Sequence, residues 1–457
     1  MTLIKSISGI RGTIGGVPGD NLTPLDVVKF ASAYGMWLKN RTKGQLKVIV
    51  GRDARISGAI VHDLVQASLL SLGIDVVDLG LSTTPTVEIA VPLENANGGI
   101  ILTASHNPKQ WNALKLLNEK GEFVSAQDGA DILSIAELEA FDFAQVDELG
   151  SSIKKDYLQI HIDAVLALST VDVKRVKAAK FKVVIDAVNS TGGIYIPALL
   201  KQMGVTVVEL YCEPNGRFPH NPEPLPEHLH DLCSLVKETK ADLGFVVDPD
   251  VDRLAIVSED GTLFGEEYTL VAVADHVLKT QKGATVSNLS STRALKDVSD
   301  KHGVRYHASA VGEVNVVSKM KEVDSPIGGE GNGGIIYPEL HYGRDSLVGI
   351  ALFLTHLAQS KLTCSDLRKT YTNYHMSKQK IQLTPNIDVD AILELMAAKY
   401  AAEDVNTLDG VKINFSNEWV HLRKSNTEPI IRVYTESTSF TKANGLAQRF
   451  INEISLL

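Results

Sequence analysis

The sequence predicts an α/β protein built from a repeated strand–turn–helix unit and followed by a smaller C-terminal α+β segment. Three observations support this fold class. The chain has 457 residues, 44% of them hydrophobic, which is more than one core usually supports and indicates roughly three or four domains. Several apolar, β-branched runs end in a polar turn that precedes a helical pattern. The last segment lacks that turn signature.

The repeated unit is recognised by continuous apolar runs, which are typical of strands covered on both faces in parallel sheets. Ligands gather at the carboxyl ends of such strands, and there the sequence places Arg52 and Asp53, Ser105 and His106, Asp186, and Asp248, Asp250 and Asp252. The runs are LKVIVGRDAR (46–55), GGIILTASHNP (98–108), FKVVIDAVNSTGG (181–193), ADLGFVVDPDVDR (241–253) and, more weakly, GATVSNLSSTRAL (283–295).

The segment from about Gln379 onward has a different pattern. A helical stretch, VDAILELMAAKYA (389–401), precedes strands near VKINFSNEWVHLRKS (411–425) and EPIIRVYTES (428–437). These predict a small α+β domain. Earlier in the chain, the Pro- and Asn-rich stretch CEPNGRFPHNPEPLP (212–226) predicts a turn-laden loop.

The net charge limits the classes of ligand that the protein is expected to bind. A net charge of -10 argues against a nucleic-acid groove but not against an anionic small molecule, because a local Arg/Lys cluster can outweigh the global balance. The three cysteines are scattered, which fits a reducing cytosol. No apolar run is long enough to span a bilayer. We therefore expect a cytoplasmic protein that binds neither nucleic acid nor membrane.

The stretch ILTASHNPKQWN (101–112) places Ser105 at the end of an apolar run. A small polar residue there is usually a turn or a helix cap. A serine-hydrolase arrangement is excluded, because the G-x-S-x-G pattern is missing and the adjacent His106 need not point the same way as Ser105. The local sequence leaves a cap and a nucleophile as alternatives.

The stretch DPDVDR (248–253) is the strongest chemical signal. Three aspartates at alternating positions repel one another unless a cation neutralises them, and carboxylates suit Mg²⁺ or Mn²⁺. A calcium EF-hand is excluded because Arg253 stands where that loop needs glycine and a strand pattern precedes it. A solvated acidic turn remains the alternative.

Two further loops carry polar groups. The glycine-dense GGEGNGGIIYPELHYGRDS (328–346) holds Glu330 and Asn332, which could accept sugar hydroxyls. HLRKSNTEPIIRVYTE (421–436) suits a phosphate through Arg423, Ser425, Asn426, Thr427 and Arg432. Flexible surface turns are the alternative for both loops. Arg11, Arg52 and Arg55, taken singly, predict surface ion pairs.

Together these stretches resemble the α-D-phosphohexomutase family. TASHNP (103–108) resembles its phosphoserine loop, DPDVDR its metal loop, GEGNGG (329–334) its sugar loop and RKSNTEP (423–429) its phosphate loop; SGIRG (8–12), GRDAR (51–55) and AVGEVNV (310–316) match further family segments. The resemblance implies three related mixed α/β domains and a smaller C-terminal α+β domain around a central cleft. We expect these domains at residues 1–152, 153–254, 255–366 and 372–457.

The resemblance also implies the chemistry. Ser105 would carry a transferable phosphoryl group, and Mg²⁺ would be held by Ser105 and the three aspartates. A sugar phosphate would pass through a bound hexose 1,6-bisphosphate, which also serves as activator, while Arg11 and Arg253 neutralise charge. Glu330 and Asn332 would read ring hydroxyls. Arg423, Ser425, Asn426, Thr427 and Arg432 would hold the distal phosphate.

The sugar loop departs from the pattern of many members, since Asn332 and Gly334 replace a serine and a histidine. We therefore expect Lys115 as the general base, provided that the cationic site lowers its pKa, with His106 as second choice. Asn426 is expected in a left-handed turn. The loop sequences are most similar to archaeal-type phosphoglucosamine mutases. This similarity predicts interconversion of glucosamine 6-phosphate and glucosamine 1-phosphate, with glucose or mannose phosphates as alternatives, in a monomer or homodimer.

Two other classes of function remain. A metal-dependent sugar phosphatase would use the aspartates with water, but it leaves the C-terminal phosphate loop without a role. A non-catalytic sugar-phosphate binding protein would be expected to have lost Ser105 or one of the aspartates, and all of them are present.

Overall fold

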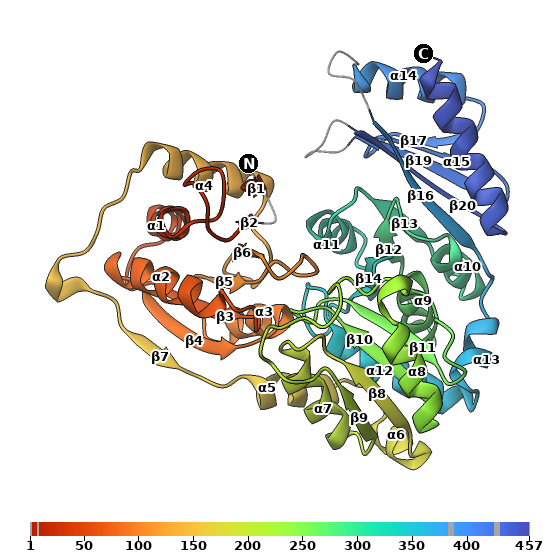
Figure 1. Cartoon of the computed structure of the whole chain (residues 1–457), viewed down its shortest axis with the longest axis horizontal. Coiled ribbons are helices and arrows are strands. Elements are labelled where there is room, and N and C mark those ends of the chain that lie inside the picture. Colours follow the sequence, from red (N-terminus) through yellow and green to blue (C-terminus); the bar gives the residue numbers. More distant parts are fainter. Residues whose placement is uncertain (1, 7–8, 383–387, 425–429, 457) are drawn as a thin grey trace.

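The computed structural model describes residues 2–6, 9–382, 388–424 and 430–456, which form four units that follow one another along the chain (Figure 1). Each unit is built on its own β-sheet. The first unit runs from β1 to β7, the second from α5 to β11, the third from α9 to α13 and the fourth from β16 to α15. Among the described helices, none has both the length and the apolar character needed to cross a membrane.

The first unit has a seven-stranded sheet in the order β1-β2-β6-β5-β3-β4-β7. Its strands are β1 (Ile4–Ser6), β2 (Gly9–Thr13), β3 (Lys47–Arg52), β4 (Asp75–Leu81), β5 (Gly98–Leu102), β6 (Trp111–Leu117) and β7 (Ser152–Lys154). Its helices are α1 (Pro24–Arg41), α2 (Gly58–Ser71), α3 (Thr84–Leu93) and α4 (Ala126–Leu138). Strand β5 is buried along its whole length, as its continuous apolar run predicts.

The second and third units each have a four-stranded sheet. The second contains β8 (Lys182–Asp186), β9 (Thr206–Leu210), β10 (Leu243–Val247) and β11 (Leu254–Ser258) with α5 (Leu158–Leu166), α6 (Val173–Ala179), α7 (Gly192–Gln202) and α8 (His230–Thr239). The third contains β12 (Thr285–Asn288), β13 (Tyr306–Ser309), β14 (Ile327–Glu330) and β15 (Gly334–Ile336) with α9 (Glu266–Val277), α10 (Ala294–Lys301), α11 (Glu313–Glu322), α12 (Ser346–Ser360) and α13 (Cys364–Lys369).

The first three units share one strand order. The orders β4-β3-β5-β6, β9-β8-β10-β11 and β13-β12-β14-β15 each consist of three parallel strands followed by one antiparallel strand. This confirms the predicted repetition of a mixed α/β unit. The repetition lies in the topology, which explains why the sequence shows no strict period.

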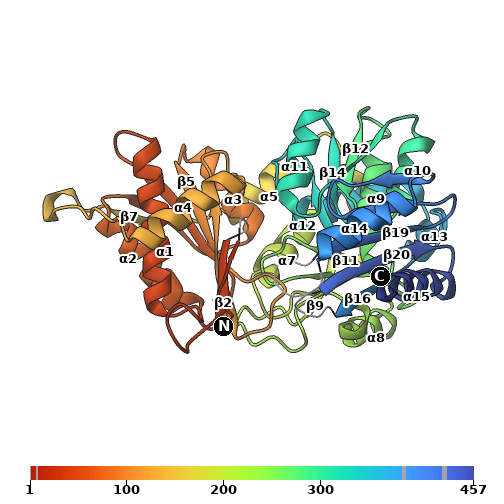
Figure 2. The same ribbon diagram turned by 90° about the horizontal axis from the view of Figure 1, so that it is seen from above.

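The fourth unit is different, as its sequence pattern predicts. Its five-stranded sheet, β16-β20-β19-β18-β17, is antiparallel throughout. It contains β16 (His375–Gln382), β17 (Asp404–Asn406), β18 (Val411–Asn414), β19 (Trp419–Lys424) and β20 (Ile430–Ser437) with α14 (Val389–Lys399) and α15 (Phe440–Ser455). The protein therefore has the α/β architecture of three related units and a smaller α+β unit, seen from above in Figure 2.

The apolar cores show how the units are joined. One continuous core runs from Ile162 to Tyr371 and joins the second and third units. The first unit has its own cores on the two faces of its sheet. The fourth unit has a core made only of its own residues, from Ile392 to Ile454 among those described.

Candidate active site

Three units present polar side chains at the same place in their shared topology, the connection between the last parallel strand and the antiparallel strand. Ser105 lies between β5 and β6, and the aspartates of residues 248–252 lie between β10 and β11. Glu330 ends β14, and Asn332 follows it before β15. The fourth unit adds arginines from β19 and β20. These connections converge where the units meet.

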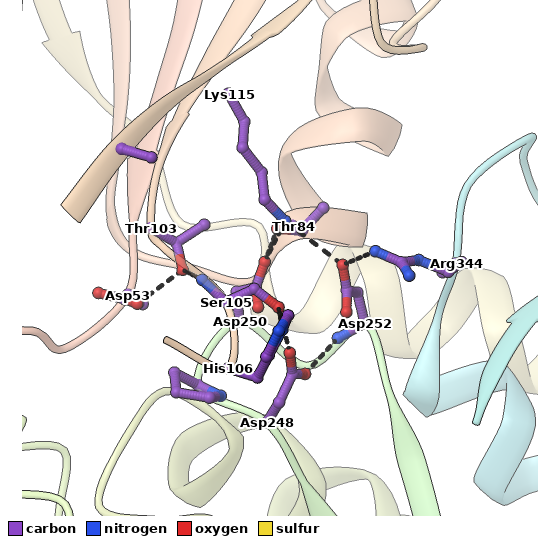
Figure 3. A network of polar contacts seen from close by, with 12 residues as sticks. Asp53, Thr84, Thr103, Ser105, His106, Lys115, Asp248, Asp250, Asp252 and Arg344 are labelled. Carbon is purple, nitrogen blue, oxygen red and sulfur yellow. Dashed lines mark hydrogen bonds and ion pairs between the residues drawn. The ribbon is translucent and has the colours of Figure 1, made fainter. Parts of the chain in front are cut away.

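Ser105 is held directly over the aspartates (Figure 3). Its hydroxyl donates a hydrogen bond of 2.6 Å to Oδ2 of Asp248, and its backbone N–H donates to Oγ1 of Thr103 at 2.9 Å. Its backbone is left-handed, with φ 49°, which a non-glycine residue rarely adopts. Nδ1 of His106 lies 3.4 Å from its Oγ. The hydroxyl of Ser105 therefore points toward the aspartates, and Ser105 caps no helix.

A buried arginine holds this loop in place. Arg55 pairs with Asp53 at 3.0 Å and donates hydrogen bonds to the carbonyl oxygens of Ser105, Asn107 (2.7 Å), Pro108 (2.8 Å) and Trp111 (3.0 Å). The prediction of a surface ion pair is wrong for Arg55, which is 1% exposed. Four of its five donors meet carbonyl oxygens of the Ser105 loop and of the first residue of β6, and the fifth meets Asp53, so every donor is satisfied in the buried site.

The three aspartates form a buried carboxylate cluster. Asp248, Asp250 and Asp252 are fully buried, and one ligand oxygen from each lies within 4.8 Å of the others. Burial, together with the charges of Asp252 and Asp250, raises the pKa of Asp248 well above its usual range. Oδ1 of Asp250 and Oδ1 of Asp252 are buried without a hydrogen-bond donor among the described residues. Converging, unsatisfied carboxylate oxygens fit a hard divalent cation.

The backbone of this loop is also constrained. Val251 has φ 65°, a left-handed conformation that is unusual for a β-branched residue. The N–H groups of Asp252 and Arg253 both donate to Oδ1 of Asp248 at 3.1 Å. The tight turn brings the three carboxylates together.

Lys115 lies beside the aspartates, and the condition attached to its role as general base, a lowered pKa, is not met in this arrangement. Its Nζ donates to Oδ2 of Asp250 at 2.7 Å and to Oδ2 of Asp252 at 3.3 Å. Burial disfavours the ammonium, but the two carboxylates outweigh burial and raise the pKa of Lys115. The same ammonium opposes the effect of burial on Asp250 and lowers the pKa of that carboxyl.

Arg344 completes the cluster, and the sequence pattern did not identify it as a site residue. Its guanidinium reaches Asp252 at 2.6 Å, Glu330 at 2.8 Å and Glu313 at 3.1 Å. It thus connects the loop of the three aspartates to the loop of Glu330. The tripeptide GRD at 343–345 repeats the GRD at 51–53, and this recurrence is the signal that could have identified it.

Thr84 was also missed. Its hydroxyl donates to Oδ2 of Asp250 at 2.5 Å from the first turn of α3. Its backbone N–H donates to the carbonyl oxygen of Asp250 at 2.9 Å. The first unit therefore fastens the aspartate loop of the second.

Glu330 and Asn332 already form hydrogen bonds with other residues of the protein. Oε1 of Glu330 accepts from Asn288 at 2.9 Å, and Oε2 accepts from Arg344 at 2.8 Å. Asn332 accepts from the N–H of Gly334 at 3.1 Å and lies 3.4 Å from Glu330. Both side chains line a cavity.

The fourth unit contributes a pair of arginines. Arg423 and Arg432 are directly opposite each other on antiparallel strands, and both line the same cavity as Asn332. Like charges in this position are unfavourable without a counter-charge. Arg423 has one in Asp409, at 2.9 Å. Ser425, Asn426 and Thr427 lie outside the described residues.

Two adjoining cavities cover the cluster. The larger, about 630 Å³, is lined by Arg11, Ser105 and Lys115, and the smaller, about 360 Å³, by residues of all four units. His106, Arg253, Glu330 and Arg344 line both. Burial and Arg253 lower the pKa of Arg11. The structure thus brings the described members of the predicted set to one central cleft between the units.

Comparisons with known families match almost the whole chain. Four models described as phosphoglucomutase/phosphomannomutase match in order: alpha/beta/alpha domain I at residues 3–142, domain II at 159–261, domain III at 265–374 and the C-terminal domain at 379–453.

Individual proteins match over similar lengths. A phosphoglucomutase/phosphomannomutase of Thermococcus kodakarensis is 35% identical, covering 94% of this chain and 95% of that protein. A phosphoglucosamine/phosphogalactosamine mutase of Sulfurisphaera tokodaii is 30% identical, covering 98% and 97%. The crystal structure of a phosphoglucomutase/phosphomannomutase family protein from Burkholderia thailandensis superposes with a TM-score of 0.86 at 26% identity, covering 99% and 98%.

Proposed function

The chain belongs to the phosphoglucomutase/phosphomannomutase family of mutases, and we propose that it interconverts hexose 6-phosphates and hexose 1-phosphates through a phosphoserine at Ser105. One observation carries this proposal. The hydroxyl of Ser105 donates a 2.6 Å hydrogen bond to Asp248, within a buried cluster of three carboxylates. A transferable phosphoryl group on that oxygen needs a concentrated positive charge beside it.

Asp248, Asp250 and Asp252 would hold Mg²⁺ together with an oxygen on Ser105. When bound, the cation neutralises charge on the phosphoryl oxygens. The protein supplies the other positive groups. Arg11 and Arg253 line the cavity around Ser105, and Lys115 and Arg344 balance the aspartates.

The proposed cycle has two transfers. The bond between Ser105 Oγ and phosphorus breaks, and the phosphoryl group joins the free hydroxyl of the sugar phosphate, forming a bound hexose 1,6-bisphosphate. The sugar then turns over, and its other phosphate returns to Ser105. Arg423 and Arg432, with Ser425, Asn426 and Thr427, would hold the distal phosphate, while Glu330 and Asn332 contact ring hydroxyls in both poses.

A base must accept the proton of the attacking hydroxyl. Lys115 is a poor acceptor as arranged here, because its ammonium already donates to Asp250 and Asp252. His106 has a ring nitrogen 3.4 Å from Ser105 Oγ and lines both cavities. We therefore assign the proton transfer to His106 and charge balance to Lys115.

Glucosamine phosphate is the proposed substrate. The loop sequence GEGNGG and the 30% identical phosphoglucosamine/phosphogalactosamine mutase support it. Glucose and mannose phosphates are the alternative substrates of the same reaction. The 35% identical phosphoglucomutase/phosphomannomutase supports these alternatives.

The deciding experiment supplies Mg²⁺, a trace of hexose 1,6-bisphosphate, and glucosamine, glucose or mannose 6-phosphate. Formation of the 1-phosphate without release of inorganic phosphate, abolished by Ser105→Ala, is the expected result. We expect kcat to fall at least about 1,000-fold, because the covalent step is removed. Steady phosphate release that survives Ser105→Ala would instead assign the aspartates to a phosphatase.

A further inference from the structure

The Pro-rich loop 212–226 belongs to the second unit but lies against the active-site turn of the first. Gly216 has φ 69°, and a Cβ there would lie 2.0 Å from the carbonyl oxygen of Ala54. The ring of Phe218 lies 5.1 Å from the guanidinium of Arg55, the residue that holds the Ser105 loop. These two contacts fix the loop beside the catalytic serine.

A histidine fixes the far end of the same loop. Nε2 of His220 lies 3.0 Å from Oδ2 of Asp186, and Nδ1 lies 2.8 Å from the carbonyl oxygen of Asn221. Asn221 in turn accepts from the N–H of Glu223 at 3.2 Å. These contacts position Glu223, whose side chain lines the smaller cavity.

Glu223 differs from the other carboxylates of that cavity. Its side chain is 35% exposed, and it lies 3.8 Å from the guanidinium of Arg253 and 4.0 Å from the imidazole of His106. Neither distance is a hydrogen bond. Glu330, by contrast, is committed to Arg344 and Asn288. Glu267 accepts from the N–H of Thr292, and burial raises its pKa to about 8, so it is mainly uncharged at neutral pH.

We propose that Glu223 is a specificity-determining residue that pairs with the 2-ammonium group of a glucosamine phosphate. This inference rests on the proposed mutase function and extends it to one residue. An amino sugar carries an ammonium near neutral pH where glucose carries a neutral hydroxyl. Among the carboxylates that line the smaller cavity, Glu223 has its oxygens available for that charge.

The position of Glu223 also predicts in which pose the contact forms. Glu223 lies near His106 and Arg253, at the Ser105 end of the cavity, whereas Arg423 and Arg432 mark the other end. The 2-amino group is one bond from C1. It therefore faces Glu223 when C1 points toward Ser105, the pose of bound glucosamine 6-phosphate, and lies farther away when C6 does.

The test compares Glu223→Gln with Glu213→Gln, an exposed glutamate of the same loop, in the full-length enzyme. For glucosamine 6-phosphate, Glu223→Gln is expected to raise KM about tenfold, the lower range for a charged hydrogen bond because the group is partly exposed. KM for glucose 6-phosphate is expected to stay within about twofold, and the shift for glucosamine 1-phosphate to be smaller. Glu213→Gln should change none of these values.

Each other outcome has a separate meaning. Equal shifts for glucosamine and glucose 6-phosphates, or no shift for either, would overturn the role of Glu223 and leave the mutase reaction intact. A wild-type enzyme that converts glucose 6-phosphate but not glucosamine 6-phosphate would also overturn it. Failure to convert any hexose phosphate would reject the proposed function itself.

Discussion

The two ends of the central cleft are built differently. At the Ser105 end, charged side chains from three units interlock in buried ion pairs, and the second and third units share one apolar core. The fourth unit keeps its own core, and several polar contacts connect it to the third. These contacts include Lys412 Nζ to the Leu289 carbonyl (2.7 Å), Ser290 Oγ with His421 Nδ1 (2.9 Å), Val311 N–H to Asp409 (2.9 Å) and Arg293 N–H to Glu436 (3.1 Å).

The two ends of the cleft meet different requirements of the proposed reaction. The phosphoryl transfer proposed for Ser105 depends on charges that are positioned before the reaction, and the buried, cross-linked Ser105 end meets this requirement. Holding a distal phosphate requires a cationic surface that can accept the sugar in two orientations, and a polar contact is sufficient to place it. Substitutions at the first end should therefore cost stability and rate, and those at the second should cost affinity or acid resistance.

The largest expected effect is from Arg344→Met. This change leaves Asp252, Glu330 and Glu313 without their shared cation. Breaking a buried ion pair by removing one partner lowers the free energy of unfolding by about 3 to 5 kcal/mol. The shift of the urea unfolding transition measures it.

Arg293→Met is the matched control from the fourth-unit contact. Arg293 is partly exposed, and its guanidinium donates to the carbonyl oxygens of Ser416 (3.3 Å) and Phe415 (3.5 Å) and lies 5.9 Å from the ring centre of Tyr374, without a carboxylate partner among the described residues. The same substitution there should lower the free energy of unfolding by about 1 kcal/mol or less. Equal losses at the two arginines would contradict the distinction between the two ends.

The second prediction concerns acid. Burial lowers the pKa of His421 to about 4, although its hydrogen bond to the Asp409 carbonyl opposes this. The unfolded chain takes up the proton near pH 6.5, so this part of the stability is complete above pH 6.5 and is lost as pH falls toward 4. Between pH 7 and 4.5 the loss should be about 2 to 3 kcal/mol.

His421→Gln isolates that contribution, because glutamine keeps a donor and an acceptor but does not titrate. The free energy of unfolding should fall between pH 7 and pH 4.5 in both proteins. In this variant the fall should be smaller than in the wild type by about 2 to 3 kcal/mol. The exposed His230→Gln is the control and should leave the pH dependence unchanged. An unaltered pH slope in His421→Gln would count against a buried neutral imidazole at this contact.

The same contrast shows what the sequence can predict. Ser105, Asp248, Asp250 and Asp252 lie where their own strands end, so the strand pattern placed them at this edge of their sheets. The resemblance of the motifs to a known family was needed to assign roles to Ser105 and Glu330. Arg55, Arg344 and Thr84 bind residues far away in the chain, and nothing in their local sequence encodes those partners. The condition on Lys115, a lowered pKa, could not be checked from the sequence for the same reason, since its carboxylate partners come from another unit.

The smallest expected effect is from Arg432→Gln, at the distal end. Arg432 stands opposite Arg423 across the two strands, and removing one of two opposed positive charges should leave the free energy of unfolding unchanged or slightly higher. KM for hexose 6-phosphates should rise about tenfold, the cost of one charged hydrogen bond, with a smaller change in kcat. The shift should be similar for glucosamine and glucose 6-phosphates, because in the proposed function the arginine holds the phosphate that both carry. A selective effect on glucosamine 6-phosphate would instead place the 2-amino group at the distal end, away from Glu223.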